Sequence, residues 1–378
     1  MPAAASTAEG NVLKVVIAGG GTGGHVYPGL AIADEIRKLR SNAAIVFVGT
    51  RHRIEARVVP ARGYPLETIW ISGFRRGWSF SLLLFPLKLG VALMQSWILL
   101  RRIRPHVVIG TGGYVCGPVV YIATVLHIPT LIQEQNSYPG VTTRLLSPRV
   151  NQVHVAFEAA RRFLRRTDNV SVTGNPARFS AGELSREVAA RSMSIESRKP
   201  TLLILGGSQG SVAINSAVLE VLRGIIYSGA QIIWQTGERD YPRIAALKDV
   251  REAVERGSIR VVPFIEQMEY AYAACDLVLA RAGATTLAEL TILGKPSVLI
   301  PLPTAAADHQ TENAKSMEAA GAAIMIPERE AGVRLLSVLQ RLLGEPAALR
   351  SMGEVARGLG RPEAARILAQ SVLNLAGQ

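Results

Sequence analysis

The chain has 378 residues, 48% of them hydrophobic, so it is too long for one ordinary domain and can bury two cores. Its two cysteines, Cys116 and Cys275, lie far apart without a metal-binding spacing, which argues against a disulfide scaffold or a zinc site. Residues 1–180 carry 21 Lys and Arg against 8 Asp and Glu, whereas residues 181–378 carry 21 of each, so the net charge of +13 belongs to the first half. This asymmetry predicts an anionic partner there: acidic lipid headgroups, a polyphosphate or nucleic acid.

The first ten residues are small and polar, with neither a basic segment nor an apolar one. They predict a disordered tail over residues 1–12 rather than a signal peptide, and hence a cytoplasmic protein.

A strand, a glycine turn and a helix open the first half: the apolar run Lys14–Ala18, then GGGTGG, then the amphipathic stretch Val26–Arg40. The glycines fit the dinucleotide pattern G-x-G-x-x-G, which alone is weak. After the next strand, Ala44–Val48, no carboxylate occurs before Glu55. NAD is therefore disfavoured, although NADP stays open.

His25 follows the first glycine turn at the start of the predicted helix. The positive end of the helix dipole would lower its pKa and keep the imidazole neutral. A neutral imidazole at the mouth of a cleft is suited to accept a proton from a sugar hydroxyl.

The run Ser79–Leu100 is long enough to span a bilayer. Pro86 interrupts it, and Lys88, Gln95 and Arg102 recur every seven residues, opposite an apolar stripe of Leu87, Val91, Met94, Trp97 and Ile98. A crossing would also separate the next strand, His106–Gly110, from Val15–Ala18. We therefore expect Leu87–Leu100 to be an ordinary buried helix with a basic rim.

The segment before it mixes arginines with aromatic anchors, as a contact with a membrane surface requires. The residues predicted to make this contact are Phe74, Arg75, Arg76, Trp78 and Phe80.

Two further turns follow apolar runs in the first half: GTGGYVCGP (Gly110–Pro118) after Val107–Ile109, and QEQN (Gln133–Asn136) after Thr130–Ile132. With GGGTGGH they place three glycine-rich or polar turns at strand ends of one sheet. Such a rim offers backbone donors suited to a diphosphate.

The second half repeats the opening, with Thr201–Leu205, then GGSQGS, then the helical stretch Val212–Gly224. Its later strands are predicted at Gln231–Gln235, Arg260–Pro263, Asp276–Ala280 and Ser297–Ile300. In RAGATTLAE (Arg281–Glu289), Thr285 or Thr286 is suited to cap a helix that binds phosphate, and Glu289 to bind the hydroxyls of a ribose.

This alternation predicts an α/β fold of two Rossmann-like, doubly wound parallel-sheet domains that face each other across a cleft. The predicted domains are residues 13–178 and 179–355, with a hinge in Ser180–Lys199 and a C-terminal helix within 356–378. The domain against which the helical segment Arg361–Leu375 packs is left open. No two of the six aspartates are two residues apart, so no metal-binding D-x-D pair is expected.

Seven segments resemble the MurG family of glycosyltransferases in order and approximate spacing: GGGTGGHVYPGLA, GTGGYVCGP, QEQN, TGNPAR, GGSQG, RAGATTLAE and ADHQTENA. They lie within residues 14–315. The resemblance implies a GT-B fold, no cofactor, and inverting, metal-independent transfer of N-acetylglucosamine (GlcNAc) from UDP-GlcNAc. The implied acceptor is the 4-hydroxyl of a lipid-linked muramyl-peptide diphosphate in peptidoglycan biosynthesis, a part of cell division and cell shape, at the cytoplasmic face of the inner membrane.

The resemblance also implies roles for individual residues. His25 is the candidate base, Gly112 and Gly113 face the acceptor diphosphate, and Thr22, Gly23 and Gly24 form a donor-side loop. Ile265 would read the uracil, Glu289 the ribose and Gln310 the sugar hydroxyls. The remaining residues expected to contact UDP-GlcNAc are Asn136, Arg178, Ser208, Ala284, Thr285, Thr286, Leu287 and Ala288.

Several alternatives stay open. Another GT-B enzyme, such as a diacylglycerol glycosyltransferase, fits the same motifs, whereas a UDP-GlcNAc epimerase would not require a basic, hydrophobic N-terminal surface. A non-catalytic binding protein regulated by a nucleotide sugar is the alternative from another class. Nucleic-acid binding is disfavoured because no helix-turn-helix or RNA-binding signature occurs.

Overall fold

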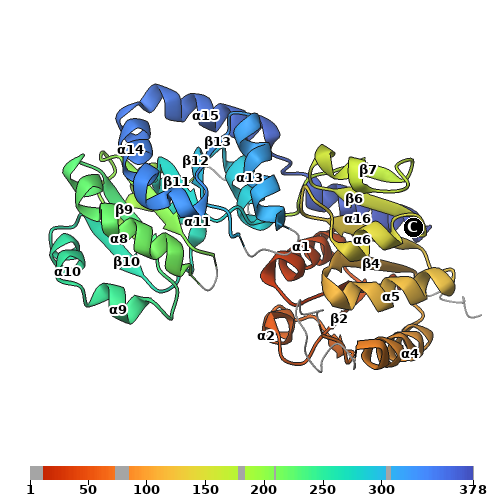
Figure 1. Ribbon diagram of the computed structural model, residues 1–378. Coiled ribbons are helices and arrows are strands. Elements are labelled where there is room, and N and C mark those ends of the chain that lie inside the picture. Colours follow the sequence, from red (N-terminus) through yellow and green to blue (C-terminus); the bar gives the residue numbers. More distant parts are fainter. Residues whose placement is uncertain (1–11, 73–84, 178–183, 208–209, 304–307, 378) are drawn as a thin grey trace, which may run out of the picture. The chain divides into compact units, whose positions relative to one another are not determined.

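The computed structural model describes residues 12–72, 85–177, 184–207, 210–303 and 308–377. The chain forms two compact units (Figure 1): unit 1 comprises Met1–Gln135, Pro139–Pro176 and Glu363–Gln378, and unit 2 comprises Asn136–Tyr138 and Ala177–Pro362. Nearly all of the predicted tail and the predicted boundary after residue 178 lie outside the described residues.

Unit 1 is built on a parallel sheet of seven described strands. In spatial order they are β3 (Leu66–Thr68), β2 (Ala44–Gly49), β1 (Lys14–Gly19), β4 (Val107–Gly112), β5 (Thr130–Glu134), β6 (Gln152–Val155) and β7 (Val170–Val172). The helical segments are α1 (Gly23–Leu39), α2 (Ile54–Ala61), α4 (Phe85–Ile103), α5 (Gly113–Val125), α6 (Val141–Leu146), η1 (Glu158–Phe163) and α16 (Ala364–Leu375).

Successive residues of each strand point to opposite faces of the sheet, and unit 1 buries both faces. In β1, Val16 and Ala18 pack in a core with residues of α4 and α5, whereas Val15 and Ile17 pack in a second core with residues of α1 and α16. The near-continuous apolar runs of its strands are therefore those of a doubly wound sheet.

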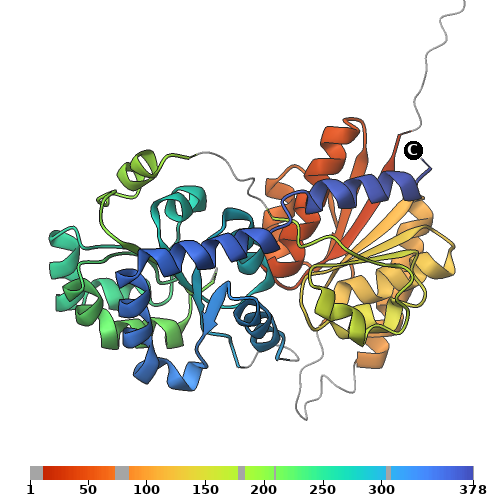
Figure 2. The ribbon, with the colours of Figure 1, turned by 90° about the horizontal axis from the view of Figure 1, so that it is seen from above.

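The C-terminal helix α16 belongs to unit 1 and lies against α1 (Figure 2). Its apolar side chains Leu368, Ala369, Val372 and Leu373 are buried in the same core as Val15 and Ile17. The C-terminal helical segment, whose packing partner the sequence leaves open, therefore packs in the N-terminal unit, unit 1.

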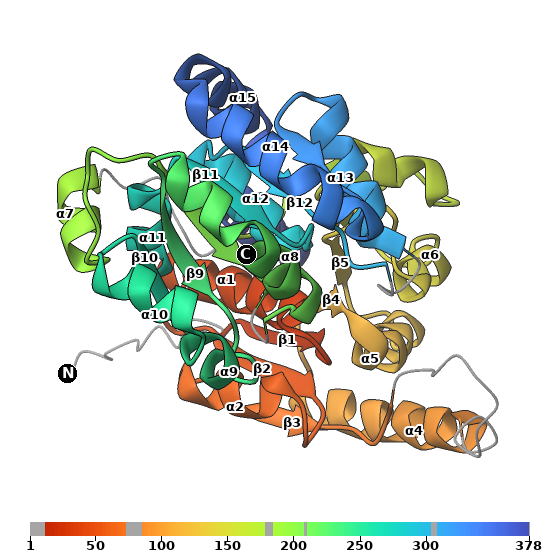
Figure 3. The same cartoon turned by 60° about the vertical axis from the view of Figure 1, so that its left-hand side comes forward.

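Helix α4 lies beside β3 (Figure 3) and presents the face opposite to the one we expected. Its small residues Ala92 and Ser96 are buried, whereas Leu87, Met94, Trp97 and Ile98 are 46–58% exposed. The prediction of a buried apolar stripe is therefore wrong.

The polar stripe of α4 explains this orientation, because its side chains bond to the edge of unit 1. Lys88 donates to Ser72 Oγ (3.1 Å), Gln95 Oε1 accepts the Trp70 N–H (2.7 Å), and Arg102 donates to Glu67 (2.7 Å). Among the residues that the structure describes, no helix is apolar and long enough to cross a membrane.

Unit 2 is built on a parallel sheet of six described strands. Their order is β10 (Ile259–Val262), β9 (Gln231–Gln235), β8 (Thr201–Leu205), β11 (Leu277–Ala280), β12 (Ser297–Leu299) and β13 (Ala323–Met325). The helical segments are α7 (Arg186–Ser192), α8 (Val212–Tyr227), α9 (Tyr241–Ala245), α10 (Lys248–Glu255), α11 (Met268–Ala274), α12 (Ala284–Leu293), α13 (His309–Ala319), η3 (Glu328–Glu330), α14 (Ala331–Gly344) and α15 (Pro346–Leu359).

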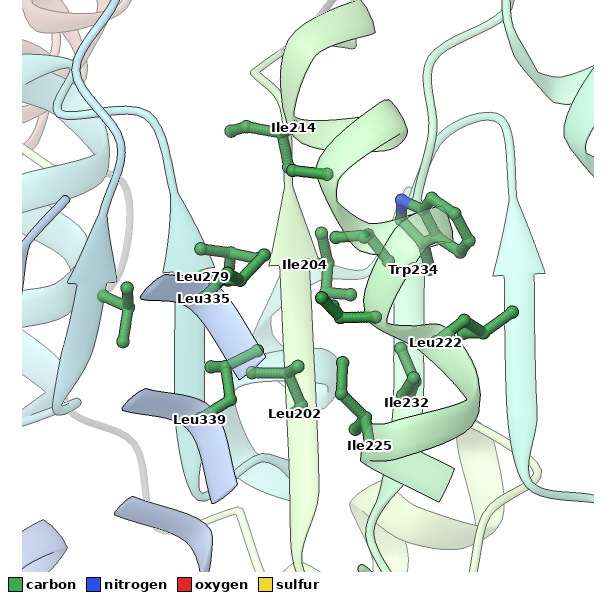
Figure 4. Close-up of a cluster of buried hydrophobic side chains, with 14 of the residues drawn as sticks. Leu202, Ile204, Ile214, Leu222, Ile225, Ile232, Trp234, Leu279, Leu335 and Leu339 are labelled. Atoms are coloured by element: carbon green, nitrogen blue, oxygen red, sulfur yellow. The ribbon is translucent and has the colours of Figure 1, made fainter. Parts of the chain in front are cut away.

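One face of this sheet packs against α8 and α14 (Figure 4). Leu202 and Ile204 of β8 lie between the α8 side chains and Leu335 and Leu339 of α14. The buried indole of Trp234 donates its N–H to Asn215 Oδ1 (3.1 Å), so the polar nitrogen of this side chain has a hydrogen-bond partner inside the core.

Candidate functional site

The three polar turns predicted for the first half do meet at one edge of the unit 1 sheet. They follow β1, β4 and β5, which are neighbours in the sheet and end at the same edge because all three are parallel. Gln135, after β5, donates its side-chain N–H to the carbonyl of Thr111 in β4 (2.7 Å). The edge is thus joined across the turns by hydrogen bonds.

His25 lies at this edge, in the first turn of α1 and half-buried. Its Nδ1 is 3.1 Å from the carbonyl oxygen of Gly20 and 3.2 Å from Thr22 Oγ1. A carbonyl oxygen only accepts, so the shorter contact places a hydrogen on Nδ1. In the neutral imidazole, Nε2 is then the nitrogen with the lone pair, which is the form a general base needs.

Gly112 and Gly113 make room for the imidazole. Both have positive φ, 102° and 78°, which favours glycine. A Cβ on Gly112 would lie 2.6 Å from His25 Cδ2 and 3.1 Å from Nε2, and one on Gly113 would collide with the Gly20 carbonyl. A side chain at either position would displace the imidazole or the Gly20 carbonyl that it contacts, whatever part these glycines have in binding the acceptor.

Glu55, at the start of α2, is a residue of this edge for which sequence analysis predicts no role. It is fully buried and accepts hydrogen bonds from the N–H of Gly21 (3.0 Å) and from the N–H and hydroxyl of Thr50 (3.0 and 2.7 Å). In the sequence, Glu55 is the first carboxylate after the predicted strand Ala44–Val48. A carboxylate 34 residues from Gly21 carries no local signal of this contact.

In unit 2 the corresponding edge carries the start of α12. The helix begins at Ala284 after the N-cap residue Gly283, and no side chain caps it. The prediction that Thr285 or Thr286 caps this helix is wrong, because both lie inside its first turn. The first backbone N–H groups of a helix have no hydrogen-bond acceptor within the helix. The buried Thr285 Oγ1 also has no hydrogen-bond partner among the described residues. The start of α12 therefore offers several unsatisfied donors to an anion.

Glu289 lies further along α12 and is held by a buried tyrosine of α11. Tyr272 is 1% exposed, and its hydroxyl donates to Glu289 Oε2 (2.9 Å). Burial, together with the Glu289 carboxylate, raises the pKa of Tyr272 well above its ordinary value, so the hydroxyl stays a donor. Tyr272 is a second residue that sequence reasoning missed.

Two side chains tie the loops of the unit 2 edge together. Arg281 donates to Ser211 Oγ (2.8 Å) and to the carbonyls of Ile300 and Pro301 (3.1 and 3.0 Å). Gln235 donates to the Gly207 carbonyl and accepts the N–H of Ile265 (3.0 and 2.9 Å). The sequence motif contained Arg281 without indicating this bridging role.

Asn136 and Gln310 lie in unit 2 with the α12 loop. Asn313 donates to Asn136 Oδ1 (3.4 Å) and to the carbonyl of Ala282 (3.2 Å), while Gln310 Oε1 accepts the N–H of Leu302 (3.0 Å). Two of the predicted donor contacts, Arg178 and Ser208, lie outside the described residues, as do all five predicted membrane residues.

A cavity of about 600 Å³ lies at the opposite edge of the unit 2 sheet, where β8, β11 and β12 begin. None of the predicted site residues lines it, and two of its cations already serve the fold. Arg186 forms an ion pair with Asp276, and Lys295 donates to the Cys275 carbonyl (2.9 Å). We therefore place the candidate site at the carboxyl ends of the strands, where doubly wound sheets bind ligands.

Within the described residues, no group of three or more His, Cys, Asp and Glu side chains is arranged to hold a metal ion.

Comparison with known proteins first defines the class. Residues 15–155 match the glycosyltransferase family 28 N-terminal domain, and residues 201–367 match the glycosyltransferase family 28 C-terminal domain. With two parallel-sheet α/β units, the chain is a glycosyltransferase of the GT-B fold.

The relatives narrow the class to one family. The chain is 44% identical to the UDP-N-acetylglucosamine--N-acetylmuramyl-(pentapeptide) pyrophosphoryl-undecaprenol N-acetylglucosamine transferase of Salinibacter ruber, over 96% of each chain. It is 45% identical to the transferase of the same name from Chlorobaculum parvum, over 96% of this chain and 99% of the other. The crystal structure of Acinetobacter baumannii MurG superposes with a TM-score of 0.75 at 29% identity, covering 96% of this chain and 99% of that one. The chain belongs to this family of N-acetylglucosamine transferases, the MurG family.

Proposed function

We propose that the protein transfers GlcNAc from UDP-GlcNAc to the 4-hydroxyl of the muramyl sugar in a lipid-linked muramyl-pentapeptide diphosphate. The reaction forms a β-1,4 bond with inversion and serves peptidoglycan biosynthesis. The observation that carries the proposal is the 44% identity, along nearly the whole of both chains, to a transferase whose name states this sugar donor and this acceptor.

His25 is the proposed general base. As the 4-hydroxyl oxygen bonds to C1 of GlcNAc, Nε2 takes the hydroxyl proton and the bond from C1 to the phosphate oxygen breaks, so that UDP leaves with the electron pair. Support comes from the contact of Nδ1 with the Gly20 carbonyl, which puts the lone pair of the neutral ring on Nε2. Gly112 and Gly113 would adjoin the acceptor diphosphate.

The α12 start is the proposed site for the donor diphosphate. The N–H groups of its first turn and the positive end of its dipole favour an anion and stabilise the charge that develops on departing UDP. The Thr285 hydroxyl adds a donor there. The stretch from Ala284 to Glu289 would thus bind diphosphate at its start and ribose at its end.

The remaining donor contacts stay close to those the sequence predicted. Ile265 would adjoin the uracil, and Gln310, whose carboxamide oxygen is engaged by Leu302, would offer its NH₂ group to the sugar hydroxyls. Asn136, Arg178 and Ser208 are further proposed donor contacts, and Thr22, Gly23 and Gly24 remain the predicted donor-side loop of unit 1.

We also assign the membrane-facing surface to unit 1, at the cytoplasmic side of the inner membrane. The exposed α4 residues Leu87, Met94, Trp97 and Ile98 lie beside cations, since the Arg101 guanidinium is 5.5 Å from the Trp97 ring centre. Half-exposed Trp70 lies under Lys88, whose Nζ is 5.6 Å from the ring centre.

Apolar anchors with adjacent cations suit a bilayer of anionic lipids, and the excess positive charge of residues 1–180 has the sign that such lipids attract. Phe74, Arg75, Arg76, Trp78 and Phe80, which precede α4 in the chain, would extend this surface.

An acceptor panel tests the proposed function. Purified protein receives radiolabelled UDP-GlcNAc with either the lipid-linked muramyl-pentapeptide diphosphate or diacylglycerol, and UDP-glucose serves as the donor control. We expect label in the muramyl lipid only, and only from UDP-GlcNAc. Label in diacylglycerol, or epimerised UDP-sugar without any transfer, would refute the proposal.

A further inference from the structure

The buried carboxylate of Glu55 lies in a slot that two glycines leave open. A Cβ on Gly20 would be 2.5 Å from Glu55 Oε1, and one on Gly49 would be 2.6 Å from its Cγ. The slot therefore admits the carboxylate only because both positions lack side chains. A fully buried carboxylate is costly unless several donors satisfy it, and Glu55 has three.

One of these donors belongs to the peptide group that also contacts His25. The peptide between Gly20 and Gly21 donates its N–H to Glu55 Oε2 (3.0 Å), and its carbonyl oxygen is 3.1 Å from His25 Nδ1. A peptide N–H bonded to an anion has a more strongly polarised carbonyl, because hydrogen bonds in a chain polarise one another. The carboxylate, the peptide and the imidazole thus form one continuous hydrogen-bond chain.

We infer that Glu55 is a positioning residue for the transferase reaction, which acts through the Gly20–Gly21 peptide to hold the proton of His25 on Nδ1 and leave Nε2 as the base. The inference rests on the proposed role of His25. In serine hydrolases a carboxylate orients the catalytic histidine by direct contact. Here the corresponding link would pass through a peptide group.

A simpler role for Glu55, anchoring the loop after β2, has to be distinguished from this one. Glu134 of β5 provides the matched control, because it is also buried and accepts hydrogen bonds from a backbone N–H, that of Gly140 (2.9 Å), and a threonine hydroxyl, that of Thr143 (2.7 Å). Both of these partners lie at the start of α6. Both carboxylates anchor loops, and Glu55 in addition bonds the peptide that contacts His25.

The kinetic test compares Glu55→Gln with Glu134→Gln. A glutamine at 55 keeps the size but can satisfy the Gly21 or the Thr50 N–H, not both. We expect Glu55→Gln to lower kcat by about 10- to 100-fold, less than the roughly 100- to 10,000-fold that loss of the general base itself would cost, with KM for UDP-GlcNAc changed less than about threefold. Because the carboxylate charge favours the imidazolium, its removal should move the acidic limb of the kcat–pH profile to lower pH, by up to about one unit. Glu134→Gln should lower the melting temperature without moving that limb.

A spectroscopic test needs no turnover. In wild-type protein labelled with ¹⁵N-histidine, and assigned with His25→Ala, we expect the His25 signals of a protonated Nδ1 and an unprotonated Nε2. Glu55→Gln should shift His25 toward a mixture of tautomers. If this variant does not fold, Gly20→Ala replaces it, since the added Cβ would push the carboxylate aside while keeping the charge.

The two tests separate the possible failures. An unmoved acidic limb with wild-type kcat in folded Glu55→Gln, or a wild-type His25 protonated on Nε2, would overturn the role of Glu55. Absence of transfer by the wild-type protein would instead refute the proposed function, and the tautomer measurement would still decide whether Glu55 sets the proton of His25.

Discussion

Replacing Glu289 with alanine should separate the binding role of this carboxylate from its structural one. Glu289 accepts the buried Tyr272 hydroxyl at 2.9 Å, and the proposed ribose contact adds a second hydrogen bond to the same charged group. A hydrogen bond to a charged group contributes about 1.5–3 kcal/mol, so we expect UDP-GlcNAc to bind Glu289→Ala about 10- to 150-fold more weakly. The orphaned tyrosine hydroxyl should also cost about 1–3 kcal/mol of unfolding free energy.

Tyr272→Phe completes a double-mutant cycle with Glu289→Ala. The double variant no longer buries an unpaired hydroxyl, so it should recover part of the lost stability while its donor affinity stays low. Titration calorimetry with UDP-GlcNAc and urea unfolding measure the two quantities on the same four proteins. Undiminished donor affinity in Glu289→Ala would refute the ribose role. Affinity that returns in the double variant would show instead that the loss came from the orphaned hydroxyl.

Three further changes test other parts of the account. His25→Ala should lower kcat at least ~100-fold while UDP-GlcNAc affinity, measured by calorimetry, changes a few-fold; unchanged turnover would remove His25 as base. Replacing Trp97 and Ile98 of α4 with serine should weaken co-sedimentation with anionic vesicles at least about tenfold, whereas Val333→Ser, also exposed but in unit 2, should not; equal effects would move the membrane surface elsewhere. Burial lowers the pKa of His154 to about 4, below its ordinary 6.5, so it contributes stability above pH 6.5 that is lost as pH falls toward 4. Between pH 7.5 and 4.5, urea unfolding of the wild type should therefore lose roughly 2–3 kcal/mol more than that of His154→Gln, and an equal loss would contradict the assignment.

Apolar runs were the reliable signal for the fold. β8 and β9 have the predicted bounds, Thr201–Leu205 and Gln231–Gln235, because each is a five-residue buried run that helices cover. β6 was missed because Gln152 and His154 alternate with its valines, and the burial of that histidine depends on neighbours distant in sequence. Short strands with polar residues are defined by their pairing rather than by their own pattern.

The orientation of α4 shows a second limit. The seven-residue spacing of Lys88, Gln95 and Arg102 correctly separated a polar from an apolar stripe, but a helix pattern does not say which stripe meets the protein. Here the polar stripe bonds to the unit and the apolar one is exposed. The proposed bilayer contact would explain this exposed apolar face.

The candidate site was predictable to the extent that it follows from strand order. Turns after neighbouring parallel strands must meet, so His25 and Gly112 were expected at one edge, and they are in contact. Glu55 and Tyr272 act through side chains that reach across the fold, and nothing in their local sequence marks them. Residues that position other residues are thus the part of the site that only the structure supplies.

The configuration of the product tests the central claim most directly. Wild-type protein is incubated with UDP-GlcNAc and the lipid-linked muramyl-pentapeptide diphosphate, the disaccharide is released from the lipid, and its linkage is determined by proton NMR. We predict GlcNAc in the β configuration on the 4-oxygen of the muramyl sugar. An α-linked GlcNAc, or attachment at any other hydroxyl, would contradict direct inverting attack by the hydroxyl that His25 is proposed to deprotonate.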